Sequence, residues 1–188
     1  RSFLKHHEDL QADPFAKISA CLCLVETWIN PSDPMTHEYT DKIMFDASKG
    51  KGRGCCALLP HGTQLGSKVT NESFQLLSFV YLDIQVILVY VSKEPDLQTL
   101  KTSIQDTFEE YSMKMVIGDF NFDCKEINTL TRYFKSKNLH QIVQEPTHNE
   151  GRTIDHIYAT QQLKSKITVT NVFKYFSDHS AFQIKLQK

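Results

Sequence analysis

The sequence predicts an α/β protein in which two packed β-sheets are covered by helices. About ten segments have the apolar or alternating pattern of strands, whereas only three have the periodicity of an amphipathic helix. So few helices do not fit a doubly wound parallel sheet, which needs a helix after nearly every strand. The length of 188 residues is typical of one domain, and no linker or repeat interrupts it. We therefore expect residues 1–188 to form a single domain.

The first half of the chain contains one predicted helix followed by strands. Ser2–Gln11 places its apolar residues on one helical side, and Ala20–Val25 is a continuous apolar run, typical of a strand buried on both faces. The alternation of apolar residues and the flanking turn residues predict the next strands. These are Lys42–Phe45, Cys55–Leu59, Ser73–Val80 and Ile84–Val91.

The second half alternates helices with strands. Asp96 is a suitable N-cap for a helix whose apolar face is formed by Leu97, Leu100, Ile104 and Phe108. The segment Glu126–Lys137 predicts a second amphipathic helix. The strands predicted around these helices are Met113–Ile117, Leu139–Val143, Ile154–Ala159, Ile167–Phe173 and Ala181–Leu186.

Net charge, apolar runs and cysteine spacing limit the classes of protein that the sequence can belong to. The formal net charge is −1, which argues against gripping nucleic acid by bulk charge alone. The longest apolar runs are too short to span a membrane, and no secretory leader is visible at the start of the sequence. The five cysteines show no metal-binding spacing, so we expect reduced thiols in or near the core of an intracellular protein.

Polar side chains follow several predicted strands at the point where each strand ends. Singly, each of these residues is an ordinary rim, turn or cap residue. Together they form a set of hard oxygen ligands with one histidine, which suits Mg²⁺ or Mn²⁺ and the hydrolysis of a phosphodiester. A histidine paired with an aspartate can carry positive charge beside a phosphate. The set consists of Glu26, Asp119, Asn121, Asp155, Asp178 and His179.

Four short motifs that carry these residues occur in the order found in a known superfamily. They are Glu26-Thr-Trp28, Gly118-Asp-Phe-Asn121, Ile154-Asp-His-Ile-Tyr158 and Ser177-Asp-His179. With these motifs the chain resembles the endonuclease/exonuclease/phosphatase superfamily, most closely the endonuclease domains of mobile elements such as retrotransposons. The second likeness depends on Arg1–Leu4, Glu26–Trp28, Gly52–Gly54 and Val89-Tyr90. The resemblance implies a four-layer sandwich of two mixed, mostly antiparallel sheets flanked by helices, with the site at one edge of the sheets.

The resemblance also implies roles for individual residues. Glu26 corresponds to the principal metal ligand, and Asp178 to an acid near the metal. Asp119 corresponds to the residue that orients or deprotonates the attacking water, and Asn121 to its neighbour that contacts phosphate. Tyr90 lies where the family has a tyrosine near the phosphate. Asp155 corresponds to the acid that orients His179. Thr147 matches a position that contacts DNA.

Other interpretations of nearby residues remain open. Tyr90 also fits plain strand core, and Asp123 fits a turn or cap. His148 and His156 are expected to be bystanders rather than ligands. Ser177 suggests a serine nucleophile, but serine, aspartate and histidine in immediate succession cannot fold back into a relay.

The expected function is a Mg²⁺-dependent endonuclease that nicks DNA and leaves a 3′-hydroxyl end, acting as a monomer in the nucleus. Lys49, Lys51 and Arg53 alternate with glycines and could hold the phosphate backbone, or form a solvated loop. Gln161–Lys188, with five lysines and one aspartate (+4), offers the same two interpretations.

Two other functions stay open. The first is a phosphatase or phosphodiesterase acting on a lipid or small phosphate ester. The second is an inactive relic that acts at most as a binding module. Family members usually begin with a strand that carries an asparagine near the metal, and this strand is not in the sequence. We therefore expect a domain truncated at its N-terminus.

Overall fold

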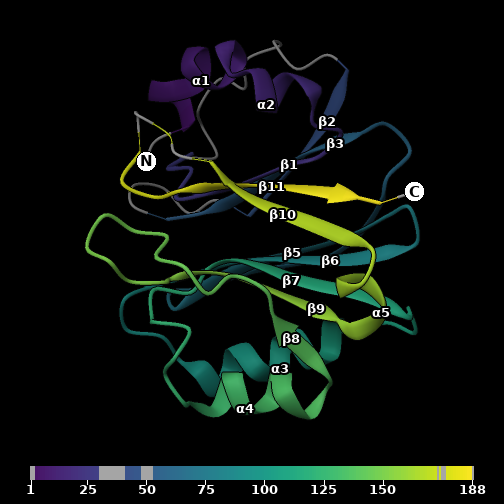
Figure 1. The fold of residues 1–188 in the computed structure, drawn as a ribbon, viewed down its shortest axis with the longest axis vertical. Helices are drawn as coiled ribbons and strands as arrows, with labels where there is room; N and C mark the ends of the chain where they lie inside the picture. The colour runs from purple at the N-terminus through teal and green to yellow at the C-terminus, as the bar shows by residue number, and fades with distance from the viewer. Residues whose placement is uncertain (1–2, 30–40, 48–52, 173, 175–176, 188) are drawn as a thin grey trace.

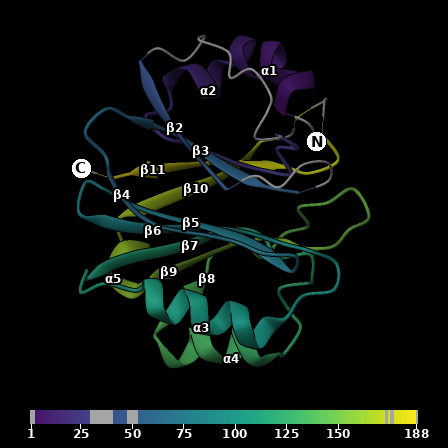
Figure 2. The same ribbon diagram turned by 180° about the vertical axis from the view of Figure 1, so that it is seen from behind.

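Four layers are stacked in the computed structural model of this chain, which describes residues 3–29, 41–47, 53–172, 174 and 177–187. Helices α1 and α2 form one outer layer, and α3 and α4 form the other (Figure 1). Two layers of β-strands lie between them, and the reverse view shows the same order (Figure 2). The four-layer sandwich implied by the resemblance is therefore confirmed.

One inner layer is a six-stranded mixed sheet with the order β4-β5-β6-β7-β9-β8. Neighbouring strands are antiparallel except β6 and β7, which are parallel. The connection between these two parallel strands is the helix α3, as a parallel pair requires. The strands are β4 (Gln64–Thr70), β5 (Phe74–Tyr81), β6 (Ile84–Val91), β7 (Met113–Asp119), β8 (Leu139–Gln141) and β9 (Asp155–Thr160).

The other inner layer consists of two smaller antiparallel sheets. One has the order β1-β3-β2, and the other pairs β10 with β11. The strands are β1 (Leu22–Val25), β2 (Lys42–Asp46), β3 (Cys55–Pro60), β10 (Ile167–Val172) and β11 (Ala181–Leu186).

A groove of about 670 Å³ lies between the two smaller sheets. All residues of β1 and of β11 line it, so the edges of both strands face the same space. Apolar residues of the six-stranded sheet form its floor, among them Val86, Leu88 and Ile117. Glu26, Asp155 and His179 also line this groove, so it is continuous with the polar site described below.

Helices close the two outer faces of the sandwich. They are α1 (Phe3–Ala12) and α2 (Pro14–Ile18) on one face and α3 (Leu97–Thr107) and α4 (Thr129–Ser136) on the other. The single turn α5 (Gln161–Lys164) follows β9 instead, and its Leu163 packs into the cluster between the two strand layers. The side chain of Asp96 accepts a hydrogen bond from the backbone N–H of Thr99 and caps α3, as the sequence predicts. Within the described residues no helix combines the length and apolar character that a membrane crossing requires.

Three apolar clusters hold the layers together. The largest fills the space between the two strand layers, where Leu59, Phe79 and Leu88 are buried. A second cluster joins the six-stranded sheet to α3 and α4 through Leu100 and Phe134. A third joins the β1-β3-β2 sheet to its helical cover. All five cysteines are free, as predicted, and Cys55 and Cys56 are buried.

Two predicted boundaries were wrong. The helix expected at Glu126–Lys137 begins at Thr129, because Asn128 forms a capping box with Thr131. Ile127, expected on its apolar face, is therefore outside the helix and 78% exposed. The predicted strand Leu139–Val143 ends at Gln141.

Other elements were missed because their sequences lack an apolar pattern. Strand β4 lies at a sheet edge and exposes most of its side chains, so the hydrophobic alternation that reveals a strand is absent. Helix α2 is only five residues long, and Asp13 caps it by accepting hydrogen bonds from Phe15 N and Ala16 N.

Candidate active site

Three polar residues lie in a row across the centre of the six-stranded sheet. Tyr90 on β6 is the register partner of Asp119 on β7, and Asp119 is the register partner of Asp155 on β9. Opposite residues on neighbouring strands direct their side chains to the same face of a sheet. The row therefore places two carboxyl groups side by side at one end of β7, although 36 residues separate them in the sequence (155 − 119).

Gly118 allows β7 to approach β6 closely enough for this row to form. Its φ is +141°, a conformation that residues with a side chain rarely adopt. A Cβ atom at this position would lie 1.8 Å from the backbone oxygen of Val89. The glycine of the Gly-Asp-Phe-Asn motif is therefore a structural requirement of the sheet that carries Asp119.

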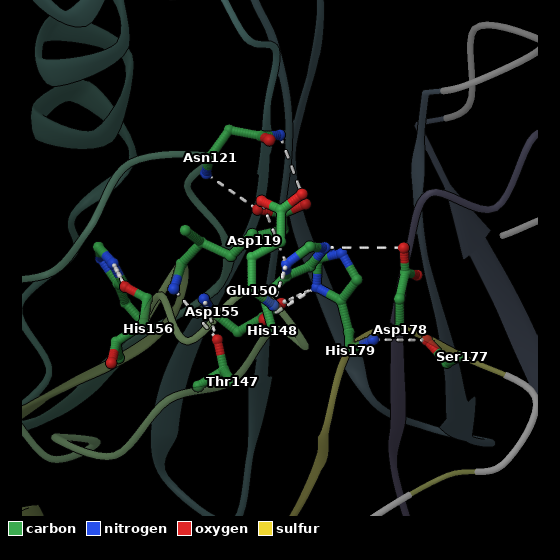
Figure 3. Close-up of polar contacts among 12 residues, drawn as sticks. Asp119, Asn121, Thr147, His148, Glu150, Asp155, His156, Ser177, Asp178 and His179 are labelled. Atoms are coloured by element: carbon green, nitrogen blue, oxygen red, sulfur yellow. Dashed lines mark hydrogen bonds and ion pairs between the residues drawn. The ribbon is translucent and has the colours of Figure 1, made fainter.

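Asp119 is fully buried and its carboxylate is held by Asn121. Its Oδ1 atom accepts a hydrogen bond from the backbone N–H of Asn121 at 2.9 Å, and Oδ2 lies 3.4 Å from the Asn121 amide nitrogen. Asn121 has a φ of +55° and donates from the same amide to the backbone oxygen of Val91. A tight turn thus fixes the carboxylate and the amide relative to each other (Figure 3).

Asp155 holds His179 from the opposite side of the site. The Nδ1 atom of His179 lies 2.9 Å from Oδ2 and 3.1 Å from Oδ1 of Asp155. Asp155 is itself positioned by Thr147, whose hydroxyl accepts hydrogen bonds from the backbone N–H groups of Ile154 and Asp155 at 3.1 and 3.0 Å. The ligand-capable atoms of Asp119, Asp155 and His179 all lie within 4.8 Å of one another.

These contacts shift the pKa values of His179 and Asp119. Burial of the imidazole opposes its charged form, but the hydrogen bond and charge of Asp155 outweigh it and raise the pKa of His179 to about 9. Burial, followed by the negative charge of Asp155, raises the pKa of Asp119 well above its usual range. His179 is therefore a cation at neutral pH, and Asp119 is a carboxyl group poised to exchange a proton.

Glu26 is not part of this cluster of ligand atoms, but its charge acts on the same residues. It follows β1 and has a φ of +51°, an unusual conformation for a residue other than glycine. Its negative charge contributes to raising the pKa values of Tyr90, Asp119 and His179. Tyr90 is buried, and desolvation is the main reason why its pKa is raised far above the ordinary value. Tyr90 is therefore strand core, and its side chain is hydrogen-bonded to Asn121. Its expected place near the phosphate stays a prediction.

Asp178 lies on the segment that leads into β11 and faces a second histidine. Its Oδ2 atom is 3.6 Å from Nε2 of His148, and one ligand atom from each of His148, Asp178 and His179 lies within 4.8 Å of the others. Carboxylates such as those of Glu26 and Asp178 are the donors that Mg²⁺ or Mn²⁺ prefers. Among the described residues, the groups of ligand atoms that lie within 4.8 Å of one another include Asp178 but not Glu26.

Thr147 is buried, whereas the resemblance matched it to a position that contacts DNA. It is only 1% exposed and its hydroxyl is occupied by two backbone N–H groups, so it does not present that hydroxyl to a DNA strand. The reason is that residues 147–149 run beside 178–180, as the hydrogen bonds Ser180 N to Thr147 O and Asn149 N to Asp178 O show. Thr147 orients Asp155 instead.

Arg53 is the described member of the predicted basic loop. Its guanidinium pairs with Glu72 at 2.5 Å and is close enough to Tyr90 to lower that residue's pKa by its charge. The other two cations predicted for this loop, Lys49 and Lys51, lie outside the described residues.

Three neighbouring residues have the structural roles that the sequence suggested. His156 is buried, stacks on Phe120 and places Nε2 3.0 Å from two backbone oxygens. Asp123 accepts hydrogen bonds from the backbone N–H groups of Lys125 and Thr153. Ser177 accepts one from the backbone N–H of His179, so it forms a turn and no relay.

His148 was expected to be a bystander, yet it lies beside His179. The two residues form a β-bridge, and their rings meet edge to face with centroids 4.9 Å apart. The sequence offered no signal for this contact, because 31 residues separate the two histidines (179 − 148).

Residues 84–183, just over half of the chain, match the sequence family described as endonuclease-reverse transcriptase. No curated protein sequence matches the chain. Among solved structures, a 3′ phosphatase (NExo) from Neisseria bound to product DNA hairpin is similar, with a TM-score of 0.74 and 13% identity over 99% of this chain and 95% of the other.

Two further solved structures have the same fold. An AP endonuclease from Archaeoglobus fulgidus is similar with a TM-score of 0.75 and 16% identity over 98% of this chain and 95% of the other. The endonuclease domain of TRAS1, a telomere-specific non-LTR retrotransposon, has a TM-score of 0.66 and 15% identity over 96% of this chain and 91% of the other. At these identities the likeness is one of fold.

Proposed function

Since the chain belongs to the endonuclease-reverse transcriptase family of the endonuclease/exonuclease/phosphatase superfamily, a group of hydrolytic nucleases and phosphatases, we propose that it is a divalent-metal-dependent endonuclease of mobile-element origin that nicks DNA. The observation that carries this proposal is the cluster of Asp119, Asp155 and His179, in which a buried carboxyl group faces an aspartate–histidine pair. A base and a cation placed together are what the hydrolysis of a phosphodiester requires.

In this mechanism each residue has a distinct task. In its ionised form Asp119 accepts a proton from the attacking water, and its hydrogen bond from Asn121 N fixes the direction of the accepting oxygen. His179, kept charged by Asp155, stabilises the negative charge that develops on the phosphate oxygens. Tyr90, hydrogen-bonded to Asn121, borders the place of the phosphate.

The carboxylates of Glu26 and Asp178 would hold a divalent ion, Mg²⁺ or Mn²⁺. Such an ion, when bound, polarises the phosphate and neutralises charge on the leaving oxygen. The substrate proposed is duplex DNA, held through its phosphate backbone. Two of the similar structures support this choice, an AP endonuclease and a phosphatase bound to a DNA hairpin. Arg53 is close enough to Tyr90 to act on it by its charge, which supports a contact between Arg53 and the backbone. We place the activity in the nucleus, with the chain acting as a monomer.

Nicking of supercoiled plasmid in the presence of Mg²⁺ tests the proposal. Wild-type protein should convert it to the open circle, leaving 3′-hydroxyl ends that a polymerase can extend. Glu26→Gln and His179→Ala should each lower the rate by about 10²-fold or more. Glu94→Gln and His61→Gln change exposed residues of the same types and serve as controls. Equal rates for wild type and the two site variants would contradict the proposal.

The same assay separates the other functions. The phosphatase alternative is supported by the structural likeness to a 3′ phosphatase, and it predicts release of inorganic phosphate from a small ester without nicking. A relic predicts a folded protein with neither activity. Removal of divalent ions with a chelator should abolish nicking, and Mg²⁺ or Mn²⁺ should restore it.

A further inference from the structure

We infer that His148, Asp178 and His179 form a zinc-selective site whose occupation blocks the proposed nuclease. The site overlaps the carboxylate set assigned to Mg²⁺ or Mn²⁺ at Asp178 and differs from it by its two histidines. The inference that zinc binds here depends only on the geometry of these three side chains. The inference that zinc inhibits nicking rests on the proposed function.

The geometry of the three side chains is close to that of a metal site. One ligand atom of each residue lies within 4.8 Å of the other two, and Nε2 of His148 is 3.6 Å from Oδ2 of Asp178. Ligands about 2.0–2.2 Å from a tetrahedral zinc ion are roughly 3.4 Å apart, so small side-chain rotations close the site. Figure 3 shows His148 and His179 approaching from separate segments with Asp178 beside them.

The chemistry of the donor set selects zinc over magnesium. Two imidazoles and one carboxylate are the ligands of many zinc sites, with a water in the fourth position. Magnesium prefers oxygen ligands and keeps most of its water, so a site with two nitrogen donors is a poor one for it.

The partners of both histidines fit metal ligation. Metal-binding histidines commonly direct the other ring nitrogen to a carboxylate, which fixes the ring. Nδ1 of His179 already makes this contact with Asp155 at 2.9 Å, which leaves Nε2 for a metal. Nδ1 of His148 accepts a hydrogen bond from Glu150 N at 3.2 Å, and the Glu150 carboxylate lies 3.7 Å from the same atom. With zinc on Nε2 the ring carries its proton on Nδ1, so the hydrogen bond from Glu150 N would be replaced by one that Nδ1–H donates to the Glu150 carboxylate.

The backbone holds the two histidines together before any ion binds. His148 and His179 form a β-bridge, and hydrogen bonds join Ser180 N to Thr147 O and Asn149 N to Asp178 O. The ligands therefore come from two segments that backbone hydrogen bonds already hold side by side, which lowers the entropic cost of ordering the ligands. Cys21 competes weakly for zinc, since burial raises the pKa of its thiol to about 11.

Zinc at this site would inhibit nicking because it takes the atom that the mechanism needs. Nε2 of His179 is the ring atom left to face the phosphate, and a bound zinc ion occupies it.

Direct binding measurements test the site without any need for activity. Titration of wild-type protein with Zn²⁺ against a fluorescent zinc indicator should show one ion per chain with a micromolar or tighter dissociation constant. Co²⁺ should give the visible absorption of a four- or five-coordinate site. His148→Gln should weaken Zn²⁺ binding by about tenfold or more, and Asp178→Asn should do the same. His61→Gln, which changes an exposed histidine of the β3–β4 turn, should bind as wild type does.

Two outcomes would overturn the inference. The first is wild-type protein that binds no Zn²⁺ at micromolar concentration. The second is unchanged binding by His148→Gln, which would place zinc on the other cluster, formed by Asp119, Asp155 and His179. In the plasmid assay, zinc should inhibit the wild type and inhibit His148→Gln only at about tenfold or higher concentration. If the wild type binds zinc but nicks no DNA, the site stands and the proposed function fails.

Discussion

The imidazole of His179 lies 2.9 Å from the carboxylate of Asp155, so that a loop residue just before the last strand is anchored to the central sheet. Asp155 also lies opposite Asp119 in the register of β7 and β9. One carboxylate thus raises the pKa values of two groups, keeping His179 charged and Asp119 protonated to a higher pH.

Replacing Asp155 by Asn should change the pH dependence of nicking as well as its rate. The raised pKa of His179, about 9, means that the imidazolium persists at neutral pH and is lost as the pH rises through 9. Without the charge of Asp155 this loss should move toward the ordinary value near 6.5. We expect a rate about 10²-fold lower above neutral pH and a partial recovery in acid, measured as a pH–rate profile.

The control for this variant is Asp83→Asn, which changes an exposed turn residue with a φ of +60° that asparagine tolerates. Its profile should match that of the wild type. A profile of Asp155→Asn that keeps its alkaline limb near pH 9 would show that Asp155 does not set the charge of His179.

Replacing Gly118 by Ala should destabilise the fold strongly. The new Cβ would meet the backbone oxygen of Val89 at 1.8 Å, and the φ of +141° is strained for alanine. Separation of β6 from β7 should cost about 3 kcal/mol or more of unfolding free energy, measured by urea denaturation. Gly62→Ala is the matched control: its φ is +83°, but no atom lies within 4 Å of the added carbon, so only a strain of about 1 kcal/mol is expected. Equal urea midpoints for the two variants would refute the close-approach argument.

Replacing Thr147 by Val should reduce both stability and activity. Valine has the same shape but cannot accept the hydrogen bonds from Ile154 N and Asp155 N, which would leave buried donors unsatisfied at a cost of about 1–3 kcal/mol. Nicking should fall because the Asp155 backbone is no longer fixed. Thr147→Ser keeps the hydroxyl and should restore most of both properties.

Thr63→Val provides the comparison, since the hydroxyl of Thr63 donates to the backbone oxygen of Pro60 in a surface turn. It should leave nicking unchanged. If Thr147→Val is as active and as stable as Thr63→Val, the positioning role is wrong.

His156 should make the protein less stable in acid. Burial lowers the pKa of His156 to about 4, whereas in the unfolded chain it titrates near 6.5. As the pH falls from about 6.5 to 4, the unfolded state binds a proton that the folded state does not, so the unfolding free energy decreases.

His179 has the opposite effect on how the unfolding free energy changes with pH. Its raised pKa contributes stability that is fully present below about pH 6.5 and is lost as the pH rises toward 9. Urea denaturation over this range should therefore show a maximum between the two effects. His156→Phe should lower stability overall, because two backbone oxygens lose a donor, but should flatten the acid side of the curve. An unchanged acid slope in this variant would assign the acid effect to another group.

The sequence by itself determined most of the fold and indicated the superfamily. Apolar runs such as Ile84–Val91 have one interpretation at this length, and the order of the motifs around Glu26, Asp119, Asp155 and His179 was sufficient to indicate the superfamily. The edge strand β4 was not predicted, because its exposed side chains show no hydrophobic alternation.

The tertiary structure decided which of the polar residues act together. The burial of Thr147 and the contact of His148 with His179 depend on two segments about 30 residues apart being paired through backbone hydrogen bonds. The shifted pKa values of Asp119 and His179 likewise depend on register across β7 and β9. Local patterns specify elements because they act between neighbours in the chain, whereas the site is made by contacts between distant segments that only the assembled sheets bring together.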